Sequence, residues 1–142
     1  MYVPSAEKMM ELGSRLARKA RKGMIYRICG PLGVGKTTLV RGFLRGLGYQ
    51  GEVRSPTFNI IHEYPTDPPV CHVDFYRLEK PEEILNLSLE DYLQTHVVLI
   101  EWAEKAPEGL FENGVTIEIE FHNTGREVKI TPDQNEKQNE AL

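Results

Sequence analysis

The residues best suited to chemistry lie in one glycine-rich loop. Gly30-Pro31-Leu32-Gly33-Val34-Gly35-Lys36-Thr37 fits the Walker A pattern G-x-x-x-x-G-K-[ST], which is typical of phosphate-binding loops. In such a loop the backbone N–H groups surround phosphate oxygens, the lysine reaches the outer phosphates and the last hydroxyl ligates Mg²⁺. The residues expected to contact a phosphorylated ligand are Gly30, Leu32, Gly33, Val34, Gly35, Lys36, Thr37 and Thr38.

The segments around this loop support the same interpretation. Residues 24–29 predict a short strand that leads into the loop, and residues 37–47 predict the helix that leaves it. The positive end of that helix would point at a bound anion. The alternative is a glycine-rich turn before a helix, without a ligand.

A second chemical signal lies at residues 96–102. Four consecutive apolar residues, 97–100, predict a strand buried on both faces, as in a parallel sheet, and Glu101 follows at its C-terminal end. In doubly wound sheets this end borders the ligand crevice, so we expect Glu101 to hold Mg²⁺ directly or through water. Trp102 is either an exposed aromatic residue beside the site or a residue at the edge of the core.

Two further residues are candidates by position. Pro56 fixes a turn, and Thr57 then opens a strand expected over residues 58–64. Thr57 is placed either like the switch threonine of nucleotide hydrolases, which contacts Mg²⁺ and the γ-phosphate, or as an ordinary residue at the start of a strand. Asp74 follows in the return strand expected over residues 70–76, as part of an antiparallel hairpin.

Alternation in this return strand places His72, Asp74 and Tyr76 on one face. An acid at the end of a strand suits a ligand crevice, and the alternative is a hydrogen-bonded surface acid. Asp74 is the weaker metal candidate, because His72 interrupts the apolar strand before it.

The remaining pattern predicts the scaffold. Residues 5–22 favour a helix with Ser5 as its N-cap and a basic run near its end, which is either a solvated end or a face for RNA or a partner. Residues 81–93 favour one helix or two short ones. Residues 114–121 and 127–131 predict a second hairpin, and residues 133–142 predict a polar, disordered tail.

Bulk properties favour one domain over residues 1–132 of the 142-residue chain. A net charge of −4 does not indicate a general polyanion binder. The sequence contains no apolar run of membrane-spanning length, and its first residues do not resemble a signal peptide. Cys29 and Cys71 lack metal or redox spacing, which suggests reduced thiols in a cytoplasmic protein.

Four motifs in a fixed order give the chain a family resemblance. They are the Gly30 loop, Ser55-Pro56-Thr57-Phe58, His72-Val73-Asp74-Phe75-Tyr76-Arg77-Leu78 and Ile100-Glu101-Trp102. Together they resemble the bacterial TsaE (YjeE) family, small P-loop ATPases of tRNA threonylcarbamoyladenosine synthesis. The resemblance implies a P-loop NTPase-like, three-layer α/β/α fold with a mixed sheet. It also implies ATP and Mg²⁺ as cofactors, TsaB and TsaD as partners, and tRNA as an indirect partner.

The same resemblance implies roles for individual residues. Lys36 and Thr37 match phosphate and Mg²⁺ ligands, and Glu101 matches the second metal ligand. Asp74 matches an acid linked to hydrolysis, and Arg126 matches a position that touches the nucleotide. Thr57 and Trp102 match residues near the switch and the partner surface.

Departures from the family pattern lie away from these roles. Pro31 stands where an acid is usual, Phe75 where leucine is commoner and Ala103 where proline is frequent.

The expected reaction is hydrolysis of ATP, slow in the isolated chain and stimulated by a partner. Its expected role is to reset the TsaB–TsaD transferase between turnovers. Lys36 would neutralise phosphate charge, Thr57 would sense the γ-phosphate and Asp74 would orient the attacking water. Arg77 is the candidate for an arginine finger within the chain. The absence of an Asn-Lys-x-Asp tetrad favours ATP over GTP. A small-molecule kinase and a binding module that does not hydrolyse nucleotide remain as alternatives.

Overall fold

A single mixed β-sheet runs through the protein. The structure is a computed structural model that describes residues 1–54, 60–80, 82–85, 87–106 and 114–133. Within these ranges the sheet has seven strands, in the order β1-β7-β6-β2-β5-β4-β3. They are β1 (Tyr2–Val3), β2 (Ile25–Cys29), β3 (Ile61–Tyr64), β4 (Val70–Asp74), β5 (Val97–Glu101), β6 (Gly114–His122) and β7 (Gly125–Pro132).

The centre of the sheet is parallel and its margins are antiparallel. Strand β2 pairs in parallel with both β5 and β6, and β4 pairs in parallel with β5. The pairs β3–β4, β6–β7 and β1–β7 are antiparallel. The C-terminal ends of β2, β4 and β5 therefore meet at one edge, where the glycine-rich loop begins.

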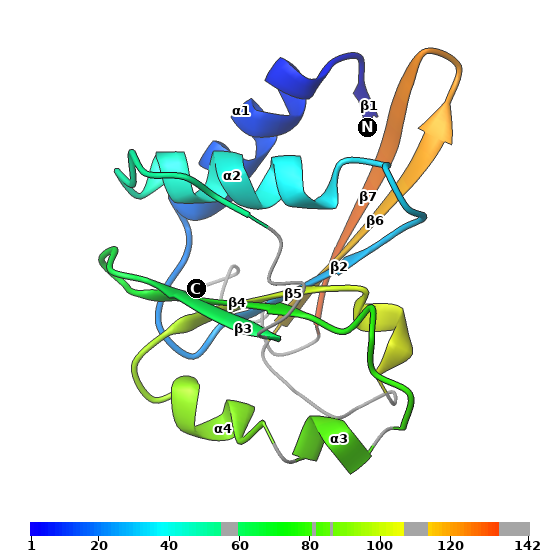
Figure 1. Cartoon of the computed structure of the whole chain (residues 1–142). Coiled ribbons are helices and arrows are strands. Elements are labelled where there is room, and N and C mark those ends of the chain that lie inside the picture. Colours follow the sequence, from blue (N-terminus) through cyan, green and yellow to red (C-terminus); the bar gives the residue numbers. More distant parts are fainter. Residues whose placement is uncertain (55–59, 81, 86, 107–113, 134–142) are drawn as a thin grey trace.

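Helices cover both faces of the sheet (Figure 1). Helices α1 (Ala6–Ala17) and α2 (Lys36–Gly46) lie on one side, and α3 (Glu82–Leu85) and α4 (Leu89–Tyr92) lie on the other. A short 3₁₀ turn, η1 (Ala103–Lys105), follows β5. This arrangement confirms the expected three-layer α/β/α fold with a mixed sheet.

Alternation in the central strands supplies a core to each helical layer. Leu99 joins the cluster beneath α1 and α2, which includes Phe43, whereas Val98 and Ile100 join the cluster above α3 and α4. All five residues of β5 are buried. The apolar run 97–100 is therefore buried on both faces, as its composition predicts.

Glycines allow α1 and α2 to approach each other very closely. A Cβ atom added to Gly42 would lie 2.1 Å from the carbonyl oxygen of Met10, and one added to Gly13 would lie 2.2 Å from that of Leu39. A Cβ atom cannot lie that close to a backbone oxygen. Only glycine at these two positions therefore lets the helices pack at this distance. Helix α1 thereby supports the helix that begins at the glycine-rich loop.

The first helix is shorter than the sequence indicates. Ser5 caps it as expected, because its hydroxyl accepts a hydrogen bond from the backbone N–H of Lys8 at 3.2 Å. The helix ends at Ala17, however, and residues 18–20 continue in 3₁₀-type bonds to carbonyls three positions earlier. Like charges three or four positions apart in the basic run 15–22 repel one another, which disfavours a longer helix.

Other boundaries differ in smaller ways. The sequence left open one helix or two short ones in the segment 81–93, and the structure has two short helices. Ser88, before the second helix, has a left-handed backbone with φ of 53°. Strand β1 was not expected from sequence. Asp133 forms an ion pair with Arg27 at 3.0 Å, one residue past the expected end of the domain. Residues 134–142 lie outside the described ranges, so the tail remains a prediction.

In the part of the chain that the structure describes, none of the helices has the length and apolar character needed to cross a membrane.

Candidate functional site

The glycine-rich loop joins the end of β2 to the start of α2. Gly33 and Gly35 have φ angles of 77° and 116°, which side-chain-bearing residues rarely adopt. Gly35 is the N-cap of α2, and no side chain caps this end of the helix. The loop thus leads directly into a helix N-terminus with a partial positive charge of about +0.5, which favours an anion.

Lys36 curls back over its own loop. Its amine donates hydrogen bonds to the carbonyl oxygens of Gly30 and Pro31, the latter at 3.0 Å. The same nitrogen lies 3.7 Å from the centre of the Trp102 ring. Burial lowers the pKa of Lys36 from its usual value, while the charges of Glu104, Glu101 and Asp74 oppose that shift.

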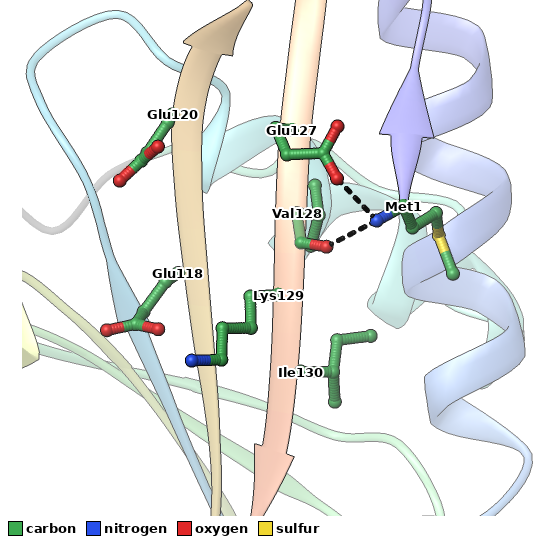
Figure 2. A pocket seen from close by; sticks show the side chains of 7 residues that line it. All are labelled: Met1, Glu118, Glu120, Glu127, Val128, Lys129 and Ile130. Carbon is green, nitrogen blue, oxygen red and sulfur yellow. Dashed lines mark hydrogen bonds and ion pairs between the residues drawn. The ribbon is translucent and has the colours of Figure 1, made fainter.

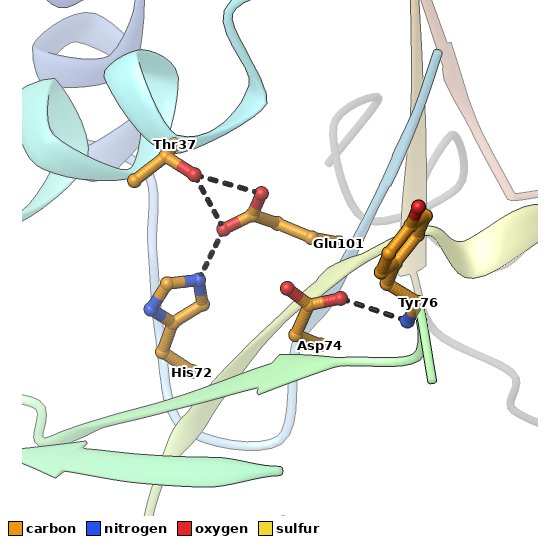
Figure 3. Close-up of polar contacts among 5 residues, drawn as sticks. All are labelled: Thr37, His72, Asp74, Tyr76 and Glu101. Carbon is orange, nitrogen blue, oxygen red and sulfur yellow. Dashed lines mark hydrogen bonds and ion pairs between the residues drawn. The ribbon is translucent and has the colours of Figure 1, made fainter. Parts of the chain in front are cut away.

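Thr37, Glu101 and His72 form a connected polar group (Figure 3). The Thr37 hydroxyl lies 2.9 Å from Glu101 Oε1 and 3.1 Å from Oε2. Nε2 of His72 lies 2.6 Å from Glu101 Oε2. The two residues expected to hold a metal therefore meet, and they come from separate elements, α2 and β5.

Asp74 lies beside this group, at the end of β4. It stands opposite Glu101 in the parallel register between β4 and β5. Its Oδ1 accepts a hydrogen bond from the backbone N–H of Tyr76 at 2.8 Å (Figure 3). Asp74 is 8% exposed, whereas Tyr76, past the end of the strand, is 46% exposed. His72 and Asp74 share a face of β4, as alternation predicts.

A hollow of about 380 Å³ collects most of the candidate residues. Its lining includes Lys36, Thr37, Asp74, Glu101 and Trp102, with Leu32 and Arg77 also among its walls. Trp102 has a left-handed backbone, with φ of 57°, and its ring lies 5.0 Å from that of Tyr76. Trp102 lies beside the site, as one of the two expectations held, and it is half-buried at the edge of the cluster above α3 and α4, as the other held.

A smaller hollow of about 190 Å³ borders the other side of the loop. Gly33, Gly35, Thr38 and Arg126 contribute to its walls. Arg126 Nε donates a hydrogen bond to the carbonyl oxygen of Val34 at 2.8 Å. The β6–β7 hairpin thereby brings Arg126 to the loop from 92 positions away. Residue spacing alone did not select Arg126, which only the family resemblance indicated.

Two contacts of the site were not expected from sequence. One is the contact between His72 and Glu101. The alternating pattern had placed His72 on the same strand face as Asp74, but it did not indicate Glu101 as its partner. Glu104 Oε2 accepts a hydrogen bond from the backbone N–H of Gly30 at 3.0 Å, for which the sequence gave no signal. Thr57 lies outside the described residues, so its switch role stays a prediction.

The donor set is compatible with Mg²⁺. A threonine hydroxyl and a buried carboxylate lie together, and a second carboxylate stands on the neighbouring strand; such hard oxygen donors suit this ion. Among the described residues, no three His, Cys, Asp or Glu side chains form a metal cluster. Magnesium commonly completes its shell with water and phosphate oxygens, so one or two side chains suffice.

A larger hollow on the sheet, of about 560 Å³, has different chemistry (Figure 2). Glu118, Glu120 and Glu127 contribute three carboxylates to its lining, against the side-chain amine of Lys129. The N-terminal amine of Met1 pairs with Glu127 at 2.7 Å. This acidic surface repels phosphate, so the glycine-rich loop is the better candidate for an anion.

Known proteins are similar to this chain over most of its length. The family described as threonylcarbamoyl adenosine biosynthesis protein TsaE matches residues 3–129. A tRNA threonylcarbamoyladenosine biosynthesis protein TsaE from Haemophilus influenzae is 35% identical over 141 residues, which cover 94% of this chain and 89% of that protein. Another from Streptomyces coelicolor is 43% identical over 116 residues, covering 79% and 78%.

A solved structure supports the same conclusion. The crystal structure of Bacillus subtilis YdiB is similar, with a TM-score of 0.78 and 30% identity, and the match covers 97% of this chain and 87% of that one. The match to the family extends from β1 through most of β7, and so includes the whole candidate site. The chain belongs to the TsaE family of threonylcarbamoyl adenosine biosynthesis proteins.

Proposed function

We propose that this chain is a Mg²⁺-dependent ATPase in tRNA threonylcarbamoyladenosine synthesis, which resets a TsaB–TsaD transferase between turnovers. The contact between Thr37 and Glu101, 2.9 Å at the N-terminus of the helix after a Walker A loop, carries the proposal. The family itself works in tRNA modification, as its description and the names of its members state.

The residues have separable roles in this proposal. The loop backbone and the start of α2 bind the phosphates, and Lys36 leaves the Gly30 and Pro31 carbonyls to neutralise phosphate charge. Thr37 and Glu101 would hold Mg²⁺, which would neutralise charge on the outer phosphates when bound. Asp74 would accept a hydrogen bond from the attacking water and so orient it.

Hydrolysis by the isolated chain should be slow. Arg77 lines the hollow but is exposed, so water screens the charge that it could offer to the phosphates. In comparable NTPases, an arginine supplied by a partner raises the rate by about 10³–10⁵-fold. We therefore expect TsaB and TsaD to stimulate ADP formation, and Glu101→Gln to abolish the stimulated rate.

The decisive experiment measures turnover of tRNA threonylcarbamoylation by TsaB and TsaD, at excess tRNA and ATP, with and without this chain. Product should stop near one per transferase without the chain and continue with it. Glu101→Gln should behave like omission, whereas Lys129→Ala, at an exposed residue of β7 in the acidic hollow, should behave like the wild type. Turnover that is indifferent to the chain would contradict the resetting role.

The fate of phosphate separates hydrolysis from the kinase alternative. Free phosphate in equal amount to ADP supports hydrolysis, and phosphate found on an added metabolite supports a kinase. No ADP formation with both partners present would instead indicate a binding module.

A further inference from the structure

His72 is an unusual residue for its place in the fold. Its side chain is 0% exposed, on a strand whose other residues before Asp74 are Val70, Cys71 and Val73. Cys71 and Val73 pack in the cluster above α3 and α4. His72 points to the opposite face of the sheet, toward the start of α2 and the Thr37 hydroxyl (Figure 3).

The hydrogen bonds of His72 are one-sided. Nε2 lies 2.6 Å from Glu101 Oε2, whereas Nδ1 is buried and has no hydrogen-bond partner among the described residues. An ionised carboxylate can only accept hydrogen bonds, so Nε2 must carry the proton that joins the pair. A neutral imidazole then leaves Nδ1 as a bare acceptor, which is less unfavourable than a buried, unpaired N–H of an imidazolium.

Glu101 has a second acid as its neighbour in the sheet. Asp74 is its register partner on the neighbouring strand, and adjacent strands stand about 4.8 Å apart. Side chains in register on neighbouring strands leave the same face of the sheet, and two like charges in such positions disfavour each other. The Thr37 hydroxyl offers one proton, and the same hydroxyl oxygen is the expected metal ligand. His72 therefore supplies the donor that stays in place when Thr37 turns its oxygen to a cation.

We propose that His72 is the positioning residue of the metal site: through Nε2–H it holds Oε2 of Glu101, so that the carboxylate faces Thr37. The proposal rests on the proposed binding of Mg²⁺ with a nucleotide. Partners that hold metal-binding side chains by hydrogen bonds typically contribute 10–100-fold to metal affinity. Removing this donor should therefore weaken Mg²⁺ binding and leave phosphate binding by the loop intact.

The experiment compares four variants with the wild type by calorimetric titration of ADP in EDTA, and by Mn²⁺ titration of the ADP-bound chain followed by electron paramagnetic resonance. His72→Phe keeps a buried ring without a donor. His72→Gln can place an amide N–H near the position of Nε2, and His72→Asn is too short to reach Glu101. His62→Phe is the matched control, because His62 stands opposite His72 in the β3–β4 register and has no hydrogen bond or ion pair in the described structure.

The proposal predicts a specific pattern. His72→Phe and His72→Asn should lower Mn²⁺ affinity by about 10–100-fold, and ADP affinity in EDTA should change less than threefold. His72→Gln should recover most of the loss, and His62→Phe should match the wild type. If His72→Phe fails to fold, the difference between the glutamine and asparagine variants gives the same test.

Two results would overturn the positioning role. One is Mn²⁺ affinity within twofold of wild type for His72→Asn, and the other is equal loss of ADP affinity with and without metal, which indicates structural damage. A wild-type chain that binds ADP no better with metal than without would instead contradict the proposed function on which this inference rests.

Discussion

Thr37 and Glu101 are 64 positions apart in the chain, yet the threonine hydroxyl lies 2.9 Å from a glutamate oxygen. The pairing of β2 with β5 explains the contact. Strand β2 pairs in parallel with β5, with Ile28 opposite Glu101, so both strands end at the same edge of the sheet. The loop after β2 then places the first turn of α2 above the end of β5. This contact is the geometric basis of the proposed metal site.

A double-mutant cycle tests whether these two residues act on one ion. Thr37→Ala and Glu101→Gln should each lower the Mg²⁺-dependent part of ADP affinity by about 10–100-fold, because each removes one of the two side chains proposed to hold the metal. The double variant should lose less than the product of the two effects, since the second change acts on a site already broken. Calorimetric titration with Mg²⁺ and with EDTA gives both parts. Full additivity would show that the residues act separately.

Trp102 should report nucleotide binding by its fluorescence. It is the single tryptophan, and the Lys36 amine lies 3.7 Å from its ring centre. Phosphates should draw this cation away and change the emission on addition of ATP or ADP. Lys36→Met should remove the response to bound nucleotide and weaken binding by about 10–100-fold, the effect of losing a charge-assisted contact.

Lys105→Met is the matched control for this signal, because the Lys105 amine lies over Tyr76, 5.1 Å from its ring centre. It should keep the response. An unchanged emission in the wild type at saturating nucleotide, confirmed by calorimetry, would show that Lys36 stays on the ring.

Gly42→Ala should destabilise the protein. The added Cβ would lie 2.1 Å from the Met10 carbonyl oxygen, so α1 must move away from α2. Overpacking costs about 1–3 kcal/mol, and the gain in helix propensity is at most about 1 kcal/mol. Urea denaturation should therefore give a lower free energy of unfolding than wild type. Arg41→Ala, one position earlier, should stay within about 0.5 kcal/mol. Equal stability of the two variants would contradict the close helix contact.

The two cysteines should resist alkylation in the folded protein. Burial raises the pKa of Cys71 to about 12, and burial with the nearby charge of Glu104 raises that of Cys29 to about 11. At pH 8 about 0.1% or less of either thiol is then the reactive thiolate. Maleimide labelling followed by mass spectrometry should be slow at pH 8 and fast in urea. Rapid labelling of the folded chain would contradict the burial.

The same pKa shifts give a pH dependence of stability. The unfolded thiols ionise near pH 8.5, well below the folded ones. Their contribution is therefore complete below about pH 8 and is lost as pH rises toward the folded pKa values. The free energy of unfolding should fall between pH 8.5 and 11. A Cys71→Ala variant should show a weaker fall, after its own loss of packing is measured at pH 7.

Local patterns were sufficient for the framework of the fold. The Walker A spacing predicted a strand, a loop and a helix, and the apolar run before Glu101 predicted a buried central strand. Both patterns depend on residues that are near neighbours in the chain. Alternation likewise placed His72 and Asp74 on one face. The predicted end of α1 was wrong. Repulsion within the basic run and the turn after it outweigh the helical spacing of the apolar residues.

The sequence by itself determined the phosphate loop, the acids at the strand ends and the family to which the chain belongs. Only the tertiary structure decided that His72 holds Glu101, that Glu104 accepts a bond from Gly30 and that Arg126 reaches Val34. These contacts join residues 29, 74 and 92 positions apart. Their partners depend on which strands are neighbours and in which register, and long-range packing sets both.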